Sequence, residues 1–307
     1  MSAVLTIQNI SKSYGSVRAL NDVSFSVPKG SVFGILGPNG SGKTTMLGII
    51  MDVLHATSGS FLWNGQPGSN KELRKHIGTL LETPNFYAYL SGQTNLKIAA
   101  GIKQRGHDDI DRVLTAVNLI QRKTSKFSTY SLGMKQRLAI ASSLLGDPEI
   151  LVFDEPTNGL DPAGIAEIRE LIRELNKQGK TIIMASHILD EVEKVCTHVA
   201  IMQKGVLKMT GTVKEMLSGS AGADNSILIE VGAESLAALQ AVLQQMPGIQ
   251  EIAPLENSLQ LKCDDGIDPA RINAYCFQKG IVLSQLNHKR KNLETRFLEI
   301  TGNQSDR

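Results

Sequence analysis

A glycine-rich segment from Gly37 to Thr44 contains the residue types that bind phosphate groups. Its sequence, Gly-Pro-Asn-Gly-Ser-Gly-Lys-Thr, fits the pattern GxxxxGK[ST]. Glycines let backbone N–H groups turn inward around phosphate oxygens, and a following helix adds partial positive charge at its first turn. Lys43 can bridge the outer phosphates of a nucleotide, and the Thr44 hydroxyl can ligate Mg²⁺. The alternative is a glycine loop that arose by chance.

Two acidic residues, Asp154 and Glu155, directly follow the apolar run Ile150 to Phe153. We expect this run to be a buried strand, whose carboxyl end lies at the edge where open α/β sheets bind ligands. In such a site Asp154 would hold Mg²⁺, and Glu155 would orient and deprotonate the attacking water. The alternative is an ordinary acidic turn at the end of a strand. Together with the phosphate loop, the pair predicts a nucleotide hydrolase.

The segments around these residues alternate between predicted strands and helices. The apolar run Ser31 to Leu36 leads into the phosphate loop, and a helix is predicted from about Gly42 to Leu54. After the acidic pair, Ile165, Ile168, Ile172 and Leu175 recur at helical spacing and predict one apolar helix face. Further strands are expected over three ranges: Val4 to Ile10, Val23 to Val27 and Thr181 to Ala185. The alternation predicts a mainly parallel sheet covered on both faces.

Three ranges define the expected domain organisation. Residues 91–146 are mostly helical in pattern and predict an insertion that is separate from the sheet. Residues 218–225 have the small-residue composition of a linker. Strand and helix patterns follow in the order β-α-β-β-α-β, which predicts a small α+β domain over residues 226–307. The larger domain is therefore expected to span residues 1–217.

The composition of the 307-residue chain is that of an ordinary globular protein, with 41% hydrophobic and 20% charged residues. The net charge of +2 gives no electrostatic footprint for duplex nucleic acid or an anionic membrane surface. We identify no secretory signal and no apolar run long enough to span a bilayer. Three widely spaced cysteines give neither a disulfide scaffold nor a metal knuckle. These observations predict a soluble intracellular protein.

Further motifs follow the phosphate loop in a definite order. They are Tyr130-Ser-Leu-Gly-Met-Lys-Gln-Arg137, Leu151-Val-Phe-Asp-Glu-Pro156, Asn158-Gly-Leu-Asp-Pro162 and Ser186-His187. This order strongly resembles the ATP-binding subunit of ABC transporters, over about residues 3 to 217. The resemblance implies an α/β fold: a P-loop NTPase of the ABC ATPase type with an antiparallel β subdomain and a helical subdomain. It also implies a small C-terminal α+β accessory domain.

The resemblance implies a role for each matching residue. Lys43, Glu155 and His187 would be catalytic, with His187 sensing the γ-phosphate and Glu155 acting as general base. Tyr14 would stack on adenine, although a plain strand-edge tyrosine is the alternative. Metal ligands would be Thr44, Asp154 and Glu82. The implied ATP-binding set is Tyr14, Gly37, Pro38, Asn39, Gly40, Ser41, Gly42, Lys43, Thr44 and Thr45, with Ser131, Gly133 and Asp161 acting across a dimer.

Two motifs depart from the usual family sequence. The signature, normally Leu-Ser-Gly-Gly-Gln, is Tyr-Ser-Leu-Gly-Met here, with Leu132 and Met134 replacing a glycine and a glutamine. Such forms are similar to those of exporter-type subunits that handle peptide antibiotics and lipophilic compounds. Glu82 stands where the family usually has the glutamine of the Q-loop, and resembles a variant of lantibiotic-immunity and bacitracin-resistance subunits. The alternative is that Glu82 is a surface acid. Leu90-Ser-Gly-Gln93 imitates the signature, but we interpret it as a turn into a helix.

An aromatic cluster of Phe86, Tyr87 and Tyr89 follows Glu82. In the family this segment borders the groove that receives a cytoplasmic helix of the permease. Internal packing of the helical insertion is an equally open alternative.

The sequence therefore predicts the ATP-hydrolysing subunit of an ABC transporter, which uses MgATP to power export of a peptide antibiotic, lipid or other lipophilic compound. Expected partners are a separate membrane permease and a second copy of the chain, and no nucleic acid. The expected location is the cytoplasm, at the inner face of the membrane through the permease. Two alternatives are a soluble ABC ATPase acting on ribosomes or nucleic acid, and a module that binds ATP without turnover.

Overall fold

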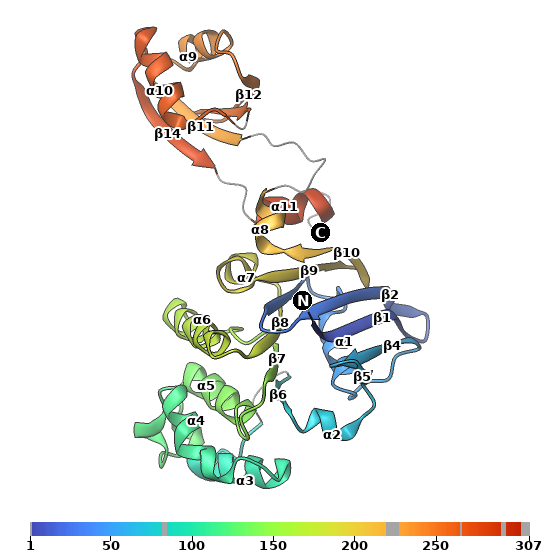
Figure 1. Ribbon diagram of the computed structural model, residues 1–307. Coiled ribbons are helices and arrows are strands. Elements are labelled where there is room, and N and C mark those ends of the chain that lie inside the picture. Colours follow the sequence, from blue (N-terminus) through green and yellow to red (C-terminus); the bar gives the residue numbers. More distant parts are fainter. Residues whose placement is uncertain (1, 82–84, 219–226, 265, 290–292, 302–307) are drawn as a thin grey trace. The chain divides into compact units, whose positions relative to one another are not determined.

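The structure is a computed structural model that describes residues 2–81, 85–218, 227–264, 266–289 and 293–301 (Figure 1). Contacts within the chain divide the protein into two compact units. The first comprises Met1–Val213 and Ile300–Arg307, and the second comprises Lys214–Glu299. The predicted linker lies outside the described residues except for Ser218. Each unit has a hydrophobic core of its own.

The first unit is built on a six-stranded sheet with the order β10-β9-β3-β8-β7-β6. All neighbouring strands are parallel except β10 and β9, which are antiparallel. In register, Leu36 pairs with Ser186, and Asp154 pairs with Ala185. The carboxyl ends of β3, β8 and β7 therefore meet at one edge, and the predicted mainly parallel sheet is confirmed. Its strands are β3 (Val32–Leu36), β6 (Ile77–Leu80), β7 (Ile150–Asp154), β8 (Thr181–Ser186), β9 (His198–Gln203) and β10 (Val206–Thr212).

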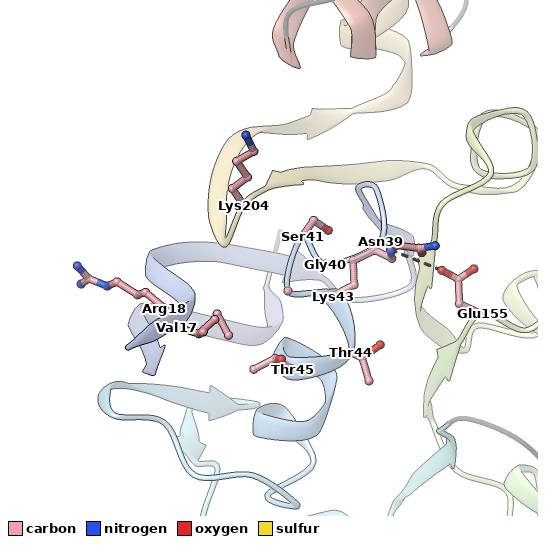
Figure 2. Close-up of a pocket in the computed structure, with 12 residues that line it drawn as sticks. Val17, Arg18, Asn39, Gly40, Ser41, Lys43, Thr44, Thr45, Glu155 and Lys204 are labelled. Carbon is pink, nitrogen blue, oxygen red and sulfur yellow. Dashed lines mark ion pairs between the residues drawn. The ribbon is translucent and has the colours of Figure 1, made fainter. Parts of the chain in front are cut away.

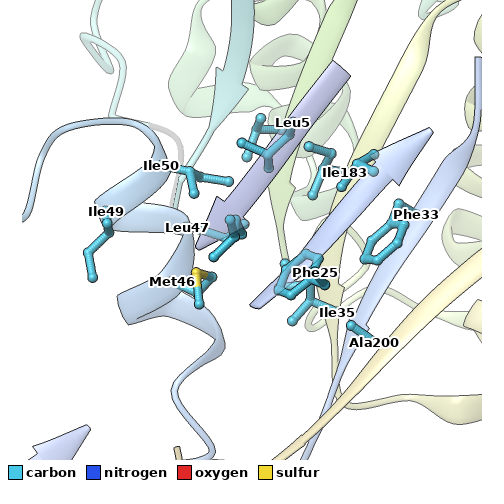
Figure 3. Packing of buried hydrophobic residues seen from close by; sticks show 14 of the residues in the cluster. Leu5, Phe25, Phe33, Ile35, Met46, Leu47, Ile49, Ile50, Ile183 and Ala200 are labelled. Carbon is cyan, nitrogen blue, oxygen red and sulfur yellow. The ribbon is translucent and has the colours of Figure 1, made fainter. Parts of the chain in front are cut away.

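An antiparallel sheet with the order β2-β1-β4-β5 forms the predicted β subdomain. The helix α1 (Lys43–Ile50) lies between this sheet and the parallel sheet, so that its side chains meet both (Figure 3). Met46 and Leu47 of α1 are fully buried, as is Leu5. Burial of this kind stabilises each large apolar side chain by about 1.5–3 kcal/mol. The strands are β1 (Ala3–Tyr14), β2 (Val17–Pro28), β4 (Ser58–Trp63) and β5 (Gln66–Pro67).

Two helices, α6 (Pro162–Lys177) and α7 (Leu189–Val195), pack on the parallel sheet. The close approach of α7 depends on Gly34 in β3, because a Cβ atom there would lie 2.8 Å from Val192 Cγ1. The predicted apolar face of α6 is nearly right: Ile165 is only partly buried, and Leu171 joins the buried side chains instead.

The helical insertion contains α3 (Gly92–Lys103), α4 (Ile110–Ala116) and α5 (Leu132–Ser143). Ser91 caps α3 by accepting a hydrogen bond from Thr94 N, so Leu90–Gln93 is a turn into a helix, as predicted. Two cations bind carbonyls at the C-terminal end of α5 and in the turn after it, as Lys103 Nζ donates to Ser142 O and Arg105 Nη2 donates to Gly146 O, both at 2.6 Å. Cations at a helix C-terminus satisfy its free carbonyls. A short helix, α2 (Lys71–Arg74), precedes β6.

The second unit contains the four-stranded antiparallel sheet β12-β13-β11-β14, with α9 and α10 packed on it. The predicted β-α-β-β-α-β order is confirmed. Its core includes Ile229, Val231, Leu239, Leu261 and Ile272, all fully buried. The elements from the end of the first unit onward are α8 (Val213–Ser218), β11 (Ile227–Ala233), α9 (Leu236–Leu243), β12 (Ile249–Pro254), β13 (Leu259–Cys263), α10 (Pro269–Gln278), β14 (Leu283–Lys289) and α11 (Leu293–Thr301).

Across the described ranges, no helix combines the length and the apolar character needed to span a membrane.

Candidate active site

The phosphate-loop sequence connects the end of β3 to the start of α1, as its motif requires. Gly40 and Gly42 have φ values of +79° and +101°, which L side chains rarely adopt. At Gly37 a Cβ atom would lie 2.4 Å from both Met202 O and Ser41 Oγ. The three glycines therefore allow a turn that residues with side chains could not form without strain. The Ser41 hydroxyl is buried and has no hydrogen-bond partner among the described residues.

A cavity of about 520 Å³ opens beside this loop (Figure 2). Most of the phosphate-binding residues predicted from the sequence line it, and so does Glu155. Gly37, Pro38 and Asp154 do not line it. The lining residues are Val17, Arg18, Ala19, Asn39, Gly40, Ser41, Gly42, Lys43, Thr44, Thr45, Glu155 and Lys204.

Lys43 is a buried cation, with a side chain that is 6% exposed. Its Nζ donates to Gly37 O at 2.8 Å and to Pro38 O at 3.3 Å. The same Nζ forms an ion pair with Glu155 Oε1 at 3.6 Å, and the dashed line in Figure 2 marks this pair. A buried charge needs partners, and these three oxygens supply them. The ammonium group thus faces both the phosphate loop and the carboxylate at the end of β7.

Glu155 adopts a φ of +46°, which is unusual for a residue with a side chain. Its backbone N–H donates to Ala185 O at 3.0 Å, which holds the strained residue against β8. Its Oε2 lies 2.9 Å from Nδ1 of His187, the residue that follows β8. The structure therefore brings the three predicted catalytic residues into one chain of contacts, Lys43–Glu155–His187. Strained backbone of this kind clusters at functional sites.

The predicted metal ligands can be placed only in part. Thr44 is in the first turn of α1, and Asp154 is the buried last residue of β7. A hydroxyl and a carboxylate are oxygen ligands, which suit Mg²⁺. Glu82 lies outside the described residues. No cluster of three histidine, cysteine, aspartate or glutamate side chains that could hold a metal occurs in the described part of the chain.

His187 and four other predicted site residues do not line the cavity either. Tyr14 is 47% exposed at the end of β1, with Lys12 Nζ 4.9 Å from its ring centroid. Ser131 caps α5 by accepting from Met134 N, and Asp161 caps α6 by accepting from Gly164 N. Gly133 follows Ser131 in the first turn of α5. The action of the last three residues across a dimer stays a prediction.

Four residues that no motif predicted also line the cavity: Val17, Arg18, Ala19 and Lys204. They lie at the start of β2 and in the turn between β9 and β10, and no local motif marks them. Only the tertiary fold brings these turns to the phosphate loop. Figure 2 shows the side chains of Arg18 and Lys204 directed away from the loop, so we assign neither to the phosphates.

The aromatic cluster contains one ring that packs internally and two that are exposed, so each of the two predicted alternatives describes part of it. Phe86 packs inside the helical insertion, with its ring 5.3 Å from that of Phe127 in an edge-to-face arrangement. Tyr87 and Tyr89 are 52% and 69% exposed. A second cavity of about 500 Å³ lies beside them, and its lining includes Phe86, Tyr87 and Ile102.

Comparison with known proteins identifies the family. The family described as "ABC transporter" matches residues 20–158. The uncharacterized ABC transporter ATP-binding protein YhcH of Bacillus subtilis is 38% identical over 306 residues, which cover 98% of this chain and 97% of YhcH. The chain belongs to the family of ABC transporter ATP-binding proteins. It is the ATP-binding subunit of a transporter, and the resemblance found in the sequence is confirmed.

Two further relatives of this ABC subunit are named for peptide antibiotics. The bacitracin transport ATP-binding protein BcrA of Enterococcus faecalis is 32% identical over 311 residues, covering 98% of this chain and 97% of BcrA. The lantibiotic transport ATP-binding protein SrtF of Streptococcus pyogenes is 42% identical over 202 residues, covering 66% of this chain and 88% of SrtF. The predicted likeness to bacitracin and lantibiotic proteins is thus confirmed. The alternative of an ATPase acting on ribosomes or nucleic acid finds no support among them.

One similar solved structure holds the products of ATP hydrolysis. A dimeric ATP-binding cassette bound to ADP and Pi in a post-hydrolysis state is 25% identical, with a TM-score of 0.62. The match covers 68% of this chain and 98% of that cassette. The predicted ABC ATPase fold is confirmed, and the ABC subunit described here is an ATP hydrolase.

Proposed function

We propose that the chain hydrolyses MgATP at composite sites formed by two copies arranged head to tail. In each site Lys43 and the loop amides bind the phosphates, and Thr44 and Asp154 hold Mg²⁺. The bound cation would neutralise negative charge on the phosphates. Glu155 orients the attacking water and accepts its proton. Glu82 stays a predicted third metal ligand.

The chain of contacts Lys43–Glu155–His187 carries this proposal. One cation, one carboxylate and one imidazole meet at the edge of the parallel sheet, beside a phosphate loop. When ATP binds, its phosphates compete with Glu155 for the ammonium group of Lys43. Glu155 is then released toward the water that it activates, while its contact with His187 keeps the imidazole near the γ-phosphate. Electrostatic stabilisation of a preorganised site is the main source of catalysis in phosphoryl transfer.

Three residues would complete the site of the partner copy. Ser131 and Gly133 stand at the first turn of α5, whose backbone N–H groups would face the γ-phosphate of the opposite site. Asp161 would connect the two sites through the segment before α6. Tyr14 would stack on adenine once its ring no longer contacts Lys12.

We further infer that the subunit powers export of a peptide antibiotic such as bacitracin or a lantibiotic. The likeness to BcrA along almost the whole of both chains supports this substrate class, because the match includes the second unit as well as the ATPase unit. The partner would be an integral-membrane permease, which would hold the chain at the cytoplasmic face of the membrane. The exposed Tyr87, Tyr89 and Ile102 would offer it apolar anchors.

The test of the ATPase site is the substitution Glu155→Gln. This change keeps the size of the side chain but removes the base, so the purified protein should bind ATP and accumulate as an ATP-bound dimer. Hydrolysis at the parental rate would overturn the assignment of the base.

The test of the transport role uses cells that express the chain together with its permease. These cells should tolerate bacitracin or a lantibiotic better than cells expressing Glu155→Gln with the same permease. Equal tolerance of both strains to both compounds would overturn the proposed substrate class and leave the ATPase assignment intact.

A further inference from the structure

Glu191 is a buried carboxyl group in α7 that belongs to none of the motifs described above. Its side chain is 4% exposed. Its Oε2 accepts a hydrogen bond from the hydroxyl of Thr157, which is also 4% exposed. Its Oε1 is buried and has no hydrogen-bond partner among the described residues. Burying a carboxyl group with one partner costs free energy, so its presence calls for a physical reason.

Glu191 and Thr157 connect the same two segments that Glu155 and His187 connect. Glu155 and Thr157 both follow β7, whereas His187 and Glu191 both follow β8. One cross-link is the 2.9 Å contact between Glu155 Oε2 and His187 Nδ1, which is partly exposed to solvent. The other is the buried hydrogen bond from Thr157 to Glu191. The second cross-link is therefore buried, whereas the first is partly exposed to solvent.

Thr157 lies in the turn that sets the conformation of Glu155. Asn158 N donates to Glu155 O at 3.1 Å, and Leu160 N donates to Thr157 O at 3.2 Å. These two successive turns hold Glu155 at its φ of +46°. Because a strained residue persists only where its surroundings over-determine it, the anchor on Thr157 helps to keep Glu155 in place.

We propose that Glu191 is a positioning residue for ATP hydrolysis, which acts through Thr157 to hold Glu155 and His187 in their productive arrangement. This inference rests on the proposed role of Glu155 as general base. It assigns to Glu191 no contact with ATP or with the attacking water.

The proposed role of Glu191 does not require a negative charge. Burial raises the pKa of Glu191, and the nearby Glu155 carboxylate adds to the rise, while Thr157, Arg169 and His187 act in the opposite direction. The Thr157 hydroxyl needs only an acceptor oxygen at this place, which an amide also supplies. Glu191→Gln should therefore retain the function that Glu191→Ala loses.

The experiment compares steady-state ATP hydrolysis and ATP binding in Glu191→Ala, Glu191→Gln, Thr157→Val and the double variant Thr157→Val with Glu191→Ala. Glu191→Ala and Thr157→Val should each lower kcat by about 10-fold or more, with ATP affinity within about 3-fold of the parent. The double variant should be no worse than the worse single variant, because both changes remove one interaction. Glu191→Gln should keep kcat within about 3-fold of the parent.

Asp190→Ala is the matched control on the same helix. Asp190 is exposed and pairs with Lys194, so this change should leave kcat unaltered. Parental kcat in Glu191→Ala or Thr157→Val, or fully additive losses in the double variant, would overturn the proposal. If Glu191→Ala does not fold, Thr157→Val decides alone, because it replaces one hydroxyl by a methyl group of similar size.

Glu155→Gln, measured in parallel, distinguishes a failure of the proposed general base from a failure of the proposed role of Glu191. If Glu155→Gln hydrolyses ATP normally, the proposed general base is wrong and the role of Glu191 falls with it. If Glu155→Gln is inactive while Thr157→Val is fully active, only the role of Glu191 is wrong.

Discussion

Lys43 Nζ lies 3.6 Å from Glu155 Oε1, so the proposed phosphate-binding cation and the proposed general base form an ion pair across the candidate site. The pair is largely buried, with side chains 6% and 20% exposed. A phosphate group that approaches Lys43 must therefore compete with the carboxylate of Glu155.

The first prediction concerns this competition. Glu155→Gln removes the negative charge that competes for Lys43, so ATP should bind as tightly as to the parent or more tightly. Hydrolysis should fall by about 100-fold or more, because a positioned general base contributes about 10²–10⁴-fold. Fluorescent-nucleotide titration and a phosphate-release assay measure the two effects. Weaker ATP binding in Glu155→Gln would contradict the competition.

The second prediction concerns Gly37. A methyl group at this position would lie 2.4 Å from Met202 O, and backbone cannot move aside cheaply. Gly37→Ala should distort the phosphate loop and abolish measurable ATP binding. Gly30→Ala is the control: Gly30 has a φ of +73° but nothing within 4 Å of a Cβ atom, so it should cost about 1–2 kcal/mol of stability and leave ATP binding unchanged. Normal ATP binding by Gly37→Ala would refute the loop geometry.

The third prediction concerns the pH dependence of stability. Burial, with a smaller contribution from the nearby Arg105, lowers the pKa of Lys103 from 10.5 to about 8. The folded state thus releases this proton more readily than the unfolded state. The free-energy cost of burying the charged Lys103 ammonium group is therefore full below pH 8 and disappears as the pH rises toward 10.5. Relative to Lys103→Met, the free energy of unfolding should rise by up to about 1.4 kcal/mol per pH unit within this range. Parallel pH profiles for the two proteins in urea unfolding would contradict the lowered pKa.

The fourth prediction concerns adenine binding. If Tyr14 stacks on the base, Tyr14→Ala should weaken ATP binding by about 5- to 160-fold, which corresponds to the 1–3 kcal/mol typical of base stacking. Tyr14→Phe keeps the ring and should bind ATP like the parent. Lys12→Ala leaves the ring free and should not weaken binding. Equal affinities of Tyr14→Ala and the parent would show that Tyr14 is an ordinary strand-edge residue.

The sequence by itself determined the family, the strands and helices around the phosphate loop and the acidic pair, and most of the candidate site. This was possible because the phosphate loop and the acidic pair are local patterns: glycine spacing and apolar runs dictate a strand, a turn and a helix whatever the rest of the chain does. The β-α-β-β-α-β order of the second unit followed from the same local periodicity.

Only the tertiary structure decided which distant residues meet. The contact of Glu155 with His187 depends on β7 and β8 being neighbours in register, and no spacing along the chain encodes that pairing. The same is true of the hydrogen bond from Thr157 to Glu191 and of the cavity-lining residues Arg18 and Lys204. Local periodicity reports which face of an element is buried, whereas the partner of a polar side chain is set by contacts between segments far apart in sequence.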